Sequence, residues 1–466
     1  MLLSLGNSWT RVTGEPHELD WLWEYLAFDD PQRAAQLRAM GRTGDSRVHL
    51  YRREGSVFPT GLVTLVQRGC QAQGYACQLV DTRQDAPPPA LDGLERAPLA
   101  LRPYQADAVR AVLGPAGGRG ILWVPTGGGK GRIAVALASV QPGNWLFLVH
   151  RAHLASDIAQ RWRELGDGSE PGIIGDGAWS VGSRFTVASL QTLWARRKSG
   201  AFRELASQTT ALTVDECHTV PADTASWLIQ QMRNARIRVG LSGTPLARGD
   251  NRSLVAVGVL GPIAYRITAD TLIQAGVLAK PTVRLVPLVQ ESKGASWADV
   301  YRELVTDSER RNRAVLEMAR RAEKPAMLFT TGVAHGRDLA KRLRQAGLNA
   351  EFVSGSASLD RRQRAVRDLA SGRLDVVCAT SVFNEGVDVP CLRSVVNAAG
   401  GKSGIATIQR AGRALRVEPG KSTATIWDVG DKGDRWLAQH ARERVRAYQR
   451  EGYPVVVDRT VAPEEG

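Results

Sequence analysis

A glycine-rich stretch at residues 124–131, VPTGGGKG, has the composition of a phosphate-binding loop between a strand and a helix. Its glycines let the backbone approach an anion closely, and the N–H groups of the following helix point at that anion. Lys130 adds positive charge toward the β and γ phosphates of a nucleotide. Such loops continue with Ser or Thr, whose hydroxyl binds magnesium, but here Gly131 follows the lysine. The sequence therefore predicts a nucleotide site that lacks one magnesium ligand.

Gly131 leaves several outcomes open. A water molecule can fill the vacant coordination position, because magnesium readily keeps water. Thr126, in the same loop, is a possible substitute donor. The remaining alternative is a site that binds nucleotide but scarcely hydrolyses it.

Two further stretches end apolar segments and carry acidic or hydroxyl groups. In LTVDECH, Asp215 stands where a magnesium-holding carboxylate belongs, and Glu216 is suited to orient and deprotonate an attacking water. In LSGTP, Ser242 and Thr244 are candidates for linking nucleotide state to domain motion. An apolar strand that runs directly into Asp-Glu-Cys-His favours catalysis over two solvated acids.

The stretch QRAGRALR, residues 409–416, carries arginines on a predicted helix. Arg413 and Arg416 are three residues apart and share one helical face. Two guanidinium groups can neutralise the charge that develops on a γ-phosphate, as arginine fingers do. A solvated basic helix is the alternative for this stretch considered alone.

Strand-like segments alternate with helical patterns from residue 99 onward, which indicates parallel sheets covered by helices. The first series comprises GILWV, WLFLV, FTVASL, ALTVDE and IRVGLSGT. The second begins near residue 282 and comprises TVRLVPLV, AMLFTT, NAEFVSG, DVVCAT, SVVNAAG and TATIWDVG. Two series predict two tandem α/β domains, both able to contact a nucleotide bound between them.

A proline-containing linker at residues 81–98 separates a small N-terminal module from these domains. The module contains predicted helices in HELDWLWEYLAF and GLVTLVQRGCQAQG, and predicted strands in RVHLYRR and YACQLVD. Its aromatic side chains either stack on bases or form the core of a small domain, and composition favours the core: these are Trp9, Trp21, Trp23 and Tyr25. The predicted domains are 1–97, 98–280, 281–452 and a tail, 453–466.

Composition limits the classes of protein to consider. The 466 residues are 43% hydrophobic and 23% charged, as in soluble globular proteins. No apolar run reaches the roughly 18 residues of a membrane span, and the N-terminus lacks the basic region of a signal peptide. These features predict a cytoplasmic protein. Five cysteines without a CxxC pair predict buried free thiols rather than a zinc site.

The formal net charge of +14 fits a polyanionic partner such as nucleic acid. Only nine of the 61 basic residues are lysine, so an arginine-rich genome is the competing explanation.

The order of the motifs resembles that of the superfamily 2 helicases and translocases of the DEAD/DEAH-like class, from about residue 100 to 430. GGGK, DECH, SGT and QRAGRALR are similar to motifs I, II, III and VI, and LRPYQ, residues 101–105, resembles the adenine-reading segment. VHRAHLASDIAQRW and TVASLQTL resemble motifs Ia and Ib, and MLFTTGVAHGRDLAKRL and ATSVFNEGVDVP resemble motifs IV and V. DECH, GRALR and the segment LGPIAYRITADTLIQAGVLAKPTV are similar to the XPB, UvsW and RadD group, which works on DNA.

This resemblance implies an α/β fold of two tandem RecA-like parallel-sheet domains with a small N-terminal α+β domain that contacts DNA. It implies an ATP-dependent DNA helicase or translocase that uses ATP and Mg²⁺ and moves 3′ to 5′. The alternatives are a hydrolysis-weak, ATP-gated DNA clamp and an RNA helicase. Single-stranded, branched or duplex DNA is the expected partner of a monomer without membrane contact, in a bacterial or phage-infected cell.

The resemblance also assigns site residues. The catalytic set is Lys130, Asp215 (also the metal ligand), Glu216, Gln409, Arg413 and Arg416. The ATP-binding set is Arg102, Gln105, Pro125, Thr126, Gly127, Gly128, Gly129, Lys130, Gly131, Gly386 and Asp388. The coupling set is His218, Ser242 and Thr244, and the nucleic-acid set is Arg151, Ser189, Gln191 and Thr380.

Overall fold

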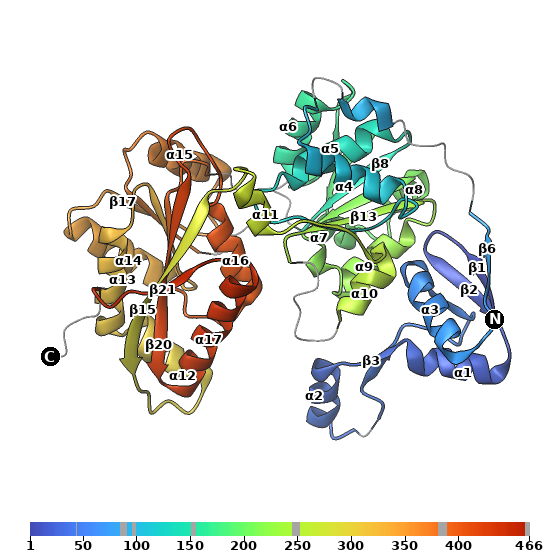
Figure 1. Ribbon diagram of the computed structural model, residues 1–466, viewed down its shortest axis with the longest axis horizontal. Helices are drawn as coiled ribbons and strands as arrows, with labels where there is room; N and C mark the ends of the chain where they lie inside the picture. Colours follow the sequence, from blue (N-terminus) through green and yellow to red (C-terminus); the bar gives the residue numbers. More distant parts are fainter. Residues whose placement is uncertain are drawn as a thin grey trace. The chain divides into compact units, whose positions relative to one another are not determined.

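The computed structural model describes the chain except residues 43, 84–90, 96–98, 151–154, 245–251, 381–388 and 462–466. The chain divides into two compact units (Figure 1). Residues 1–124 and 129–267 form the first unit, and residues 125–128 and 268–466 form the second. None of the described helices is long and apolar enough to cross a membrane.

The N-terminal domain is a four-stranded sheet with two packed helices. The sheet has the order β5-β2-β1-β6, comprising β5 (Val57–Pro59), β2 (Trp9–Thr13), β1 (Leu2–Leu5) and β6 (Gln78–Asp81). Helices α1 (Pro16–Tyr25) and α3 (Val63–Gln73) bury apolar side chains such as Leu22 and Val66. A separate pair, β3 (Ala27–Asp29) and β4 (Arg47–His49), flanks α2 (Pro31–Ala39). The predicted helices and the strands near β4 and β6 are confirmed, whereas β1, β2 and β5 were not anticipated.

The rest of the first unit is built on an eight-stranded sheet of order β10-β9-β11-β8-β12-β13-β7-β14. All neighbours are parallel except β10 and β9. Its strands are β7 (Arg119–Trp123), β8 (Trp145–Val149), β9 (Gly172–Gly175), β10 (Ala178–Trp179), β11 (Phe185–Ser189), β12 (Ala211–Asp215), β13 (Ile237–Ser242) and β14 (Ile263–Arg266). The five predicted strands are the central ones, and the three missed strands lie at the edges. Its helices are α4 (Pro103–Leu113), α5 (Lys130–Val140), α6 (Ala155–Leu165), α7 (Leu190–Ala195), α8 (Gly200–Gln208), α9 (Asp223–Gln231) and α10 (Ser253–Leu260).

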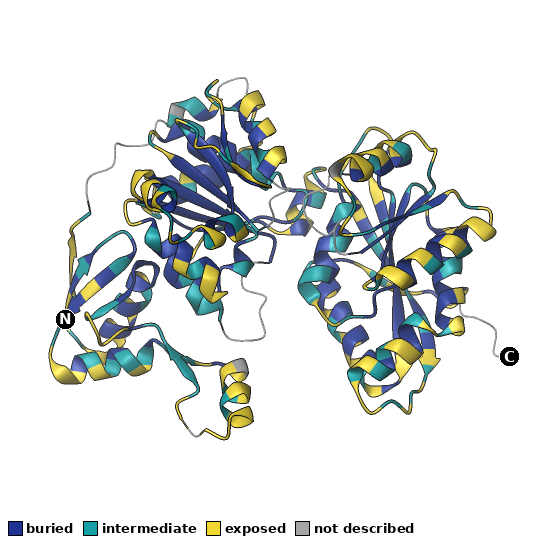
Figure 2. Cartoon of the chain, turned by 180° about the vertical axis from the view of Figure 1, so that it is seen from behind, coloured by how far each residue is buried: buried dark blue, intermediate teal, exposed yellow. Residues whose placement is uncertain are grey.

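The second unit contains a seven-stranded parallel sheet of order β17-β18-β16-β19-β20-β15-β21. Its strands are β15 (Lys280–Gln290), β16 (Ala326–Phe329), β17 (Ala350–Val353), β18 (Val376–Ala379), β19 (Ser394–Asn397), β20 (Thr423–Gly433) and β21 (Val455–Val457). Its helices are α11 (Ala269–Gln274), α12 (Trp297–Tyr301), α13 (Glu309–Arg321), α14 (Val333–Gln345), α15 (Leu359–Ala370), α16 (Gly404–Arg413) and α17 (Arg435–Arg450). The six predicted strands are all present, and β21 lies in the segment expected to be a tail. In both large sheets the strands are mostly buried and the outer faces of the helices are exposed (Figure 2).

The five cysteines are all free thiols. Cys70, Cys217 and Cys378 are buried as expected, while Cys77 and Cys391 are partly exposed. Burial raises the pKa of the Cys217 thiol well above its usual range, so this residue of the DECH segment is a neutral, buried side chain.

Two buried arginines fasten the N-terminal domain to the eight-stranded sheet. Arg238, on β13, donates to Ser8 Oγ at 2.6 Å and to the Met232 carbonyl at 2.8 Å. Ser8 Oγ in turn donates to the Gln230 carbonyl at 3.0 Å. Arg119, on β7, donates to the carbonyls of Val259 and Asn7. Buried guanidinium groups need hydrogen-bond acceptors, and the acceptors on Ser8 and Asn7 belong to the N-terminal domain, so these bonds hold the two parts together as one unit.

Gly61 provides a test of this fixed packing. A Cβ at Gly61 would lie 2.1 Å from the Val257 carbonyl oxygen, so α10 would have to move. We expect Gly61→Ala to cost roughly 1–3 kcal/mol of unfolding free energy, the usual cost of overpacking. Gly44→Ala is the matched control, because nothing lies within 4 Å of a Cβ there. Thermal unfolding of the two full-length variants measures the difference, and equal midpoints would contradict the packing described.

Candidate functional site

The strand order aligns three of the predicted motifs at one edge of the eight-stranded sheet. Strands β12, β13 and β7 are consecutive neighbours and run parallel. The DECH segment follows β12, the SGT segment ends β13, and the glycine loop follows β7. Parallel strands present their carboxyl ends at a common edge, which is where ligands bind in open α/β sheets.

Within the glycine loop, two residues require the absence of a side chain. Gly127 and Gly129 have φ angles of +85° and +79°, a region that L side chains rarely adopt. A Cβ on Gly129 would also lie 2.3 Å from Gln105 Nε2. Helix α5 starts directly after this loop at Lys130, so its N-terminus faces the space in front of the loop.

Gln105 therefore lies beside the glycine loop, in the first turn of α4. Its side chain is only 3% exposed, and its Oε1 accepts the backbone N–H of Arg102 at 3.0 Å. The structure thus brings the LRPYQ segment next to the loop, as the predicted adenine-reading role requires.

Glu216 is the centre of a compact polar cluster. Its Oε1 is 3.6 Å from Lys130 Nζ, and its Oε2 is 3.3 Å from both His218 Nδ1 and Ser242 Oγ. Its backbone is left-handed, with φ 46° and ψ 53°, and its N–H donates to Asp215 Oδ1 at 3.0 Å. A non-glycine residue in that region is strained, and such strain concentrates at functional sites. The cluster connects the glycine loop, the DECH segment and the SGT segment through one carboxylate.

The SGT segment continues this network. Ser242 Oγ is 3.3 Å from His218 Nδ1 and accepts the Thr244 N–H at 3.1 Å. The Thr244 Oγ1 atom is buried and has no hydrogen-bond partner among the described residues. These bonds link Glu216 to Ser242 and Thr244, and the coupling role of Ser242 and Thr244 stays a prediction.

Gly131 faces a neighbouring helix. A Cβ there would lie 3.1 Å from Arg161 Nε and 3.2 Å from Ile158 Cδ1, both on α6. The Arg161 Nε is itself buried without a hydrogen-bond partner among the described residues. A side chain at position 131 would therefore require the Arg161 or Ile158 side chain to shift by a few tenths of an ångström.

The predicted arginine stretch lies on α16 of the second unit and just beyond its end. Gln409 is 7% exposed, and its Nε2 has no hydrogen-bond partner in the described part of the chain. Arg416 lies past the helix and forms an isolated bridge with Leu278. The prediction that Arg413 and Arg416 share one helical face is wrong, because α16 ends at Arg413 and Arg416 lies three residues beyond that end.

A buried polar network supports this helix, and the sequence analysis did not identify it. Arg410 donates to Asn397 Oδ1 at 3.0 Å, and Asn397 donates to Asp428 Oδ2 at 3.2 Å. Asp428 also accepts bonds from Arg444 Nε at 3.0 Å and Tyr448 OH at 2.9 Å. Asn397 follows two valines in β19, and Asp428 interrupts the apolar run of Ile426, Trp427 and Val429 in β20, which was the available signal.

The predicted nucleic-acid residues differ in accessibility. Gln191, on α7, is exposed, whereas the Ser189 and Thr380 side chains are buried. Arg151, Gly386 and Asp388 lie outside the described residues.

Two family models match the chain. Residues 98–247 match the model described as "Type III restriction enzyme, res subunit", and residues 310–418 match "Helicase conserved C-terminal domain". The matched segments contain the glycine loop and the DECH and SGT segments in the first case, and QRAGRALR in the second.

The curated relatives are helicases. The chain is 24% identical to the ATP-dependent DNA helicase uvsW of Enterobacteria phage T4, with 97% of each chain covered. It is 26% identical to the DNA 3′-5′ translocase XPB2 of Sulfurisphaera tokodaii, covering 74% of this chain and 85% of that protein. It is 27% identical to putative helicase 22 of a Sulfolobus islandicus filamentous virus, and the match covers 74% of this chain and 66% of that protein.

Solved structures show the same fold. The Mycobacterium smegmatis helicase Lhr bound to single-stranded DNA and AMP-PNP matches with a TM-score of 0.55 and 20% identity, covering 79% of this chain and 52% of that one. Yeast Dbp5 bound to RNA and ADP BeF3 matches with a TM-score of 0.51 and 15% identity, covering 77% and 94%. Together with the family models, these matches show two RecA-like domains in tandem. The chain belongs to the superfamily 2 helicases, the ATP-dependent helicases and translocases, and is similar to UvsW- and XPB-type DNA helicases.

Proposed function

We propose that this protein hydrolyses ATP at the edge formed by the glycine loop and the DECH segment, and uses the reaction to move along DNA in the 3′ to 5′ direction. The observation that carries the proposal is the cluster around Glu216, in which Lys130, His218 and Ser242 meet one carboxylate. These groups lie at or just after the carboxyl ends of three adjacent strands, β7, β12 and β13, which suits a site for phosphoryl transfer.

Each residue has a distinct role in this proposal. Backbone N–H groups of the glycine loop and the Lys130 ammonium group bind the phosphates, and Gln105 reads the adenine edge. Glu216 orients the attacking water and accepts its proton. Arg413 and Arg416 stabilise the charge that grows on the γ-phosphate in the transition state.

The donor set fits magnesium as the metal. Asp215 and Glu216 offer carboxylate oxygens, the ligands that magnesium prefers. The described residues contain no group of three His, Cys, Asp or Glu side chains that could hold a metal ion. Magnesium would therefore be held by Asp215 together with nucleotide phosphates and water, and when bound it neutralises phosphate charge.

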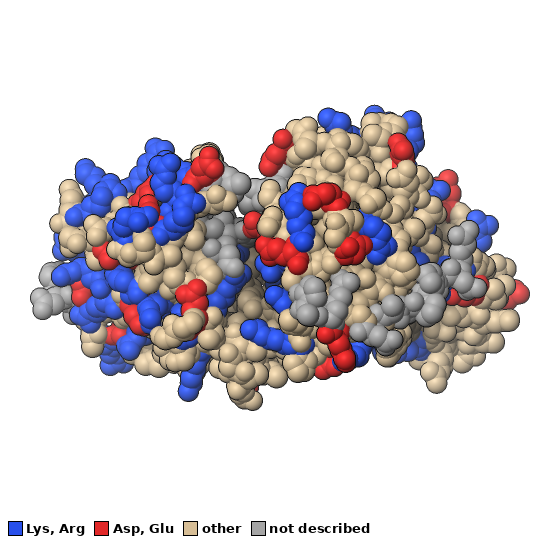
Figure 3. Space-filling view, turned by 90° about the horizontal axis from the view of Figure 1, so that it is seen from above, with Lys and Arg blue, Asp and Glu red and all other residues tan. Residues whose placement is uncertain are grey.

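DNA as the substrate is supported by charge and by the relatives. The net charge is +14, and basic side chains are numerous on the face of the second unit in Figure 3. Binding that relies on phosphates is tolerant of sequence and sensitive to salt, which suits movement along a strand. The proposed setting is the cytoplasm of a bacterial or phage-infected cell.

Strand displacement tests the direction of movement. We expect the full-length protein with ATP and magnesium to release the short strand from a duplex with a 3′ single-stranded tail and to leave a 5′-tailed duplex intact. Glu216→Gln is the control for ATP dependence. Release from the 5′-tailed duplex alone would contradict the proposed direction, and release from neither would contradict helicase action on these substrates.

Because Gly131 has no side chain to bind magnesium, we expect the protein to require an unusually high magnesium concentration for ATP hydrolysis. One oxygen ligand is missing, and a water can replace it, so we expect wild-type turnover to saturate at higher magnesium than turnover of Gly131→Ser. Serine is preferred to threonine because the Cβ already meets Arg161 at 3.1 Å. The double variant Gly131→Ser/Arg161→Ala removes that crowding, and Arg161→Ala alone is its control.

The measurement is ATPase rate against magnesium concentration. Hydrolysis that appears only in the serine variants, and never in the wild type, would favour the ATP-gated clamp instead. Gly131 is the one feature that supports that second candidate function.

A further inference from the structure

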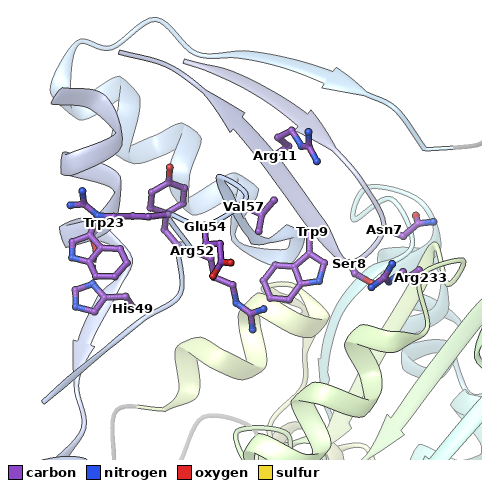
Figure 4. A pocket seen from close by; sticks show the side chains of 12 residues that line it. Asn7, Ser8, Trp9, Arg11, Trp23, His49, Arg52, Glu54, Val57 and Arg233 are labelled. Carbon is purple, nitrogen blue, oxygen red and sulfur yellow. Dashed lines mark hydrogen bonds between the residues drawn. The ribbon is translucent and has the colours of Figure 1, made fainter. Parts of the chain in front are cut away.

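A cleft of about 820 Å³ lies where the N-terminal domain meets the eight-stranded sheet domain, within the first unit (Figure 4). Its lining includes two tryptophans and four arginines: Trp9, Trp23, Arg11, Arg52, Arg53 and Arg233. Arg233 follows α9 in the sheet domain, whereas the other five come from the N-terminal domain. Any occupant of the cleft is therefore contacted by both parts of the unit.

In the cleft, each of the two tryptophan rings is in contact with an arginine guanidinium group. The Arg52 guanidinium carbon lies 4.2 Å from the centre of the Trp9 ring. The His49 ring stacks on Trp23 with centroids 3.8 Å apart, and the Arg53 guanidinium carbon is 4.9 Å from the Trp23 ring. Such rings and planar cations are the surfaces on which unstacked nucleobases bind without sequence preference.

The other two aromatic residues named in the sequence analysis lie away from the cleft. Trp21 and Tyr25 stack on each other with centroids 4.7 Å apart and pack against the domain core. They do not line the cleft, whereas Trp9 and Trp23 do. Trp23 also packs against the domain core, so it contributes to both the core and the cleft.

The charges around the cleft favour an anion. Arg11 and Arg233 are exposed, and their side chains form no hydrogen bond or ion pair among the described residues. Arg53 pairs with Asp20 at 2.9 Å, and Glu54 is the one carboxylate among the residues that line the described cleft. Arg11 and Arg233 thus leave an excess of positive charge that phosphates can neutralise.

We propose that this cleft binds a single-stranded DNA segment, with its bases stacked against Trp9 and Trp23 and its phosphates held by Arg11 and Arg233. The proposal rests on the proposed function, since it names where the first unit grips the DNA. Because Arg119 and Arg238 fix the N-terminal domain to the sheet domain, this grip moves with the sheet domain during the ATPase cycle.

The arginines are tested by binding of the full-length protein to a fluorescent single-stranded oligonucleotide without ATP, at a series of salt concentrations. Each lost phosphate contact should reduce the slope of log affinity against log salt by about 0.7. We expect Arg11→Ala/Arg233→Ala to bind more weakly and to lower this slope by about 1.4. Arg68→Ala, an exposed arginine on α3 outside the cleft, is the matched control and should leave the slope unchanged.

Stacking is tested by Trp9→Ala and by abasic DNA. We expect Trp9→Ala to weaken binding roughly 5- to 150-fold, the range of one base–aromatic stack. An oligonucleotide of abasic sites should bind wild type more weakly, and Trp9→Ala should add little further loss. Trp9→Phe keeps an aromatic surface and should retain most of the affinity, which separates stacking from a folding defect.

Some results would overturn the proposal. If the double arginine variant and Trp9→Ala bind the oligonucleotide like Arg68→Ala, and abasic DNA binds wild type as tightly as normal DNA, the cleft does not hold a DNA strand. If Trp9→Ala weakens binding but wild type binds abasic DNA as tightly as normal DNA, base stacking in the cleft is also excluded. DNA-stimulated ATPase at saturating DNA should survive in every cleft variant, so failure of the cleft and failure of the proposed function give separate results.

Discussion

Glu216→Gln should lower the ATP turnover number by about 10²- to 10⁴-fold while ATP binding is retained, because removing a general base removes that much of the rate. Glutamine has nearly the same shape as glutamate and can still bond Ser242, which lies 3.3 Å away. It cannot accept the proton of the attacking water. We therefore expect the variant to accumulate with ATP bound and to stay associated with DNA.

Steady-state turnover and binding of a fluorescent ATP analogue, measured on the same preparation, test this expectation. Glu204→Gln is the matched control, since Glu204 is exposed on α8 and its carboxylate bonds only the Gln208 side chain among the described residues. Turnover in Glu216→Gln equal to that of wild type would remove the carboxylate from the mechanism.

Alanine at Arg413 or Arg416 should reduce turnover far more than ATP affinity. The charge that these groups meet grows in the transition state, and arginine fingers contribute about 10³- to 10⁵-fold to turnover. Lysine should rescue little, because an ammonium group cannot reproduce bidentate contacts with phosphate oxygens. Arg442→Ala is the control on the same unit, where the side chain is exposed on α17.

The adjacent Arg410 allows a structural role to be distinguished from a catalytic one. Arg410 bonds Asn397 within the buried Asp428 network, so Arg410→Ala should lower thermal stability as well as turnover. Arg413→Ala and Arg416→Ala should lower turnover with an unchanged unfolding midpoint. Equal losses of turnover and ATP affinity in the latter two would mean that they do not act on the transition state.

The central strands of both large sheets were predictable because they are buried on both faces. WLFLV and AMLFTT, for example, are apolar runs of strand length bounded by polar or glycine-containing segments. Edge strands such as β10 and β21 are short and only partly buried, so their composition does not distinguish them from loops.

The candidate site was predictable where a motif specifies chemistry. Lys130, Asp215 and Glu216 were identified from residue type and spacing, and the strand order brings their segments to one edge. The contacts of His218 with Glu216 and of Gln105 with the glycine loop depend on tertiary packing, so no local pattern could establish them.

The packing of the N-terminal domain was not predictable for the same reason. Arg238 lies in a strand that is otherwise apolar, and its partner Ser8 is more than 200 positions away in the sequence. Gly61 touches α10 through its backbone, which leaves no compositional signal. Deleting residues 1–97 would expose this interface, so variants in the cleft test DNA contact more cleanly than a truncated chain does.

The account is tested most directly by the ATPase rate of the wild-type protein with no polynucleotide, single-stranded DNA, duplex DNA and RNA, measured side by side at saturating magnesium. The account predicts hydrolysis that DNA stimulates and RNA does not, and that Glu216→Gln abolishes. Hydrolysis stimulated by RNA rather than DNA would identify an RNA helicase. The absence of hydrolysis under every condition would contradict the central claim and would favour the ATP-gated clamp.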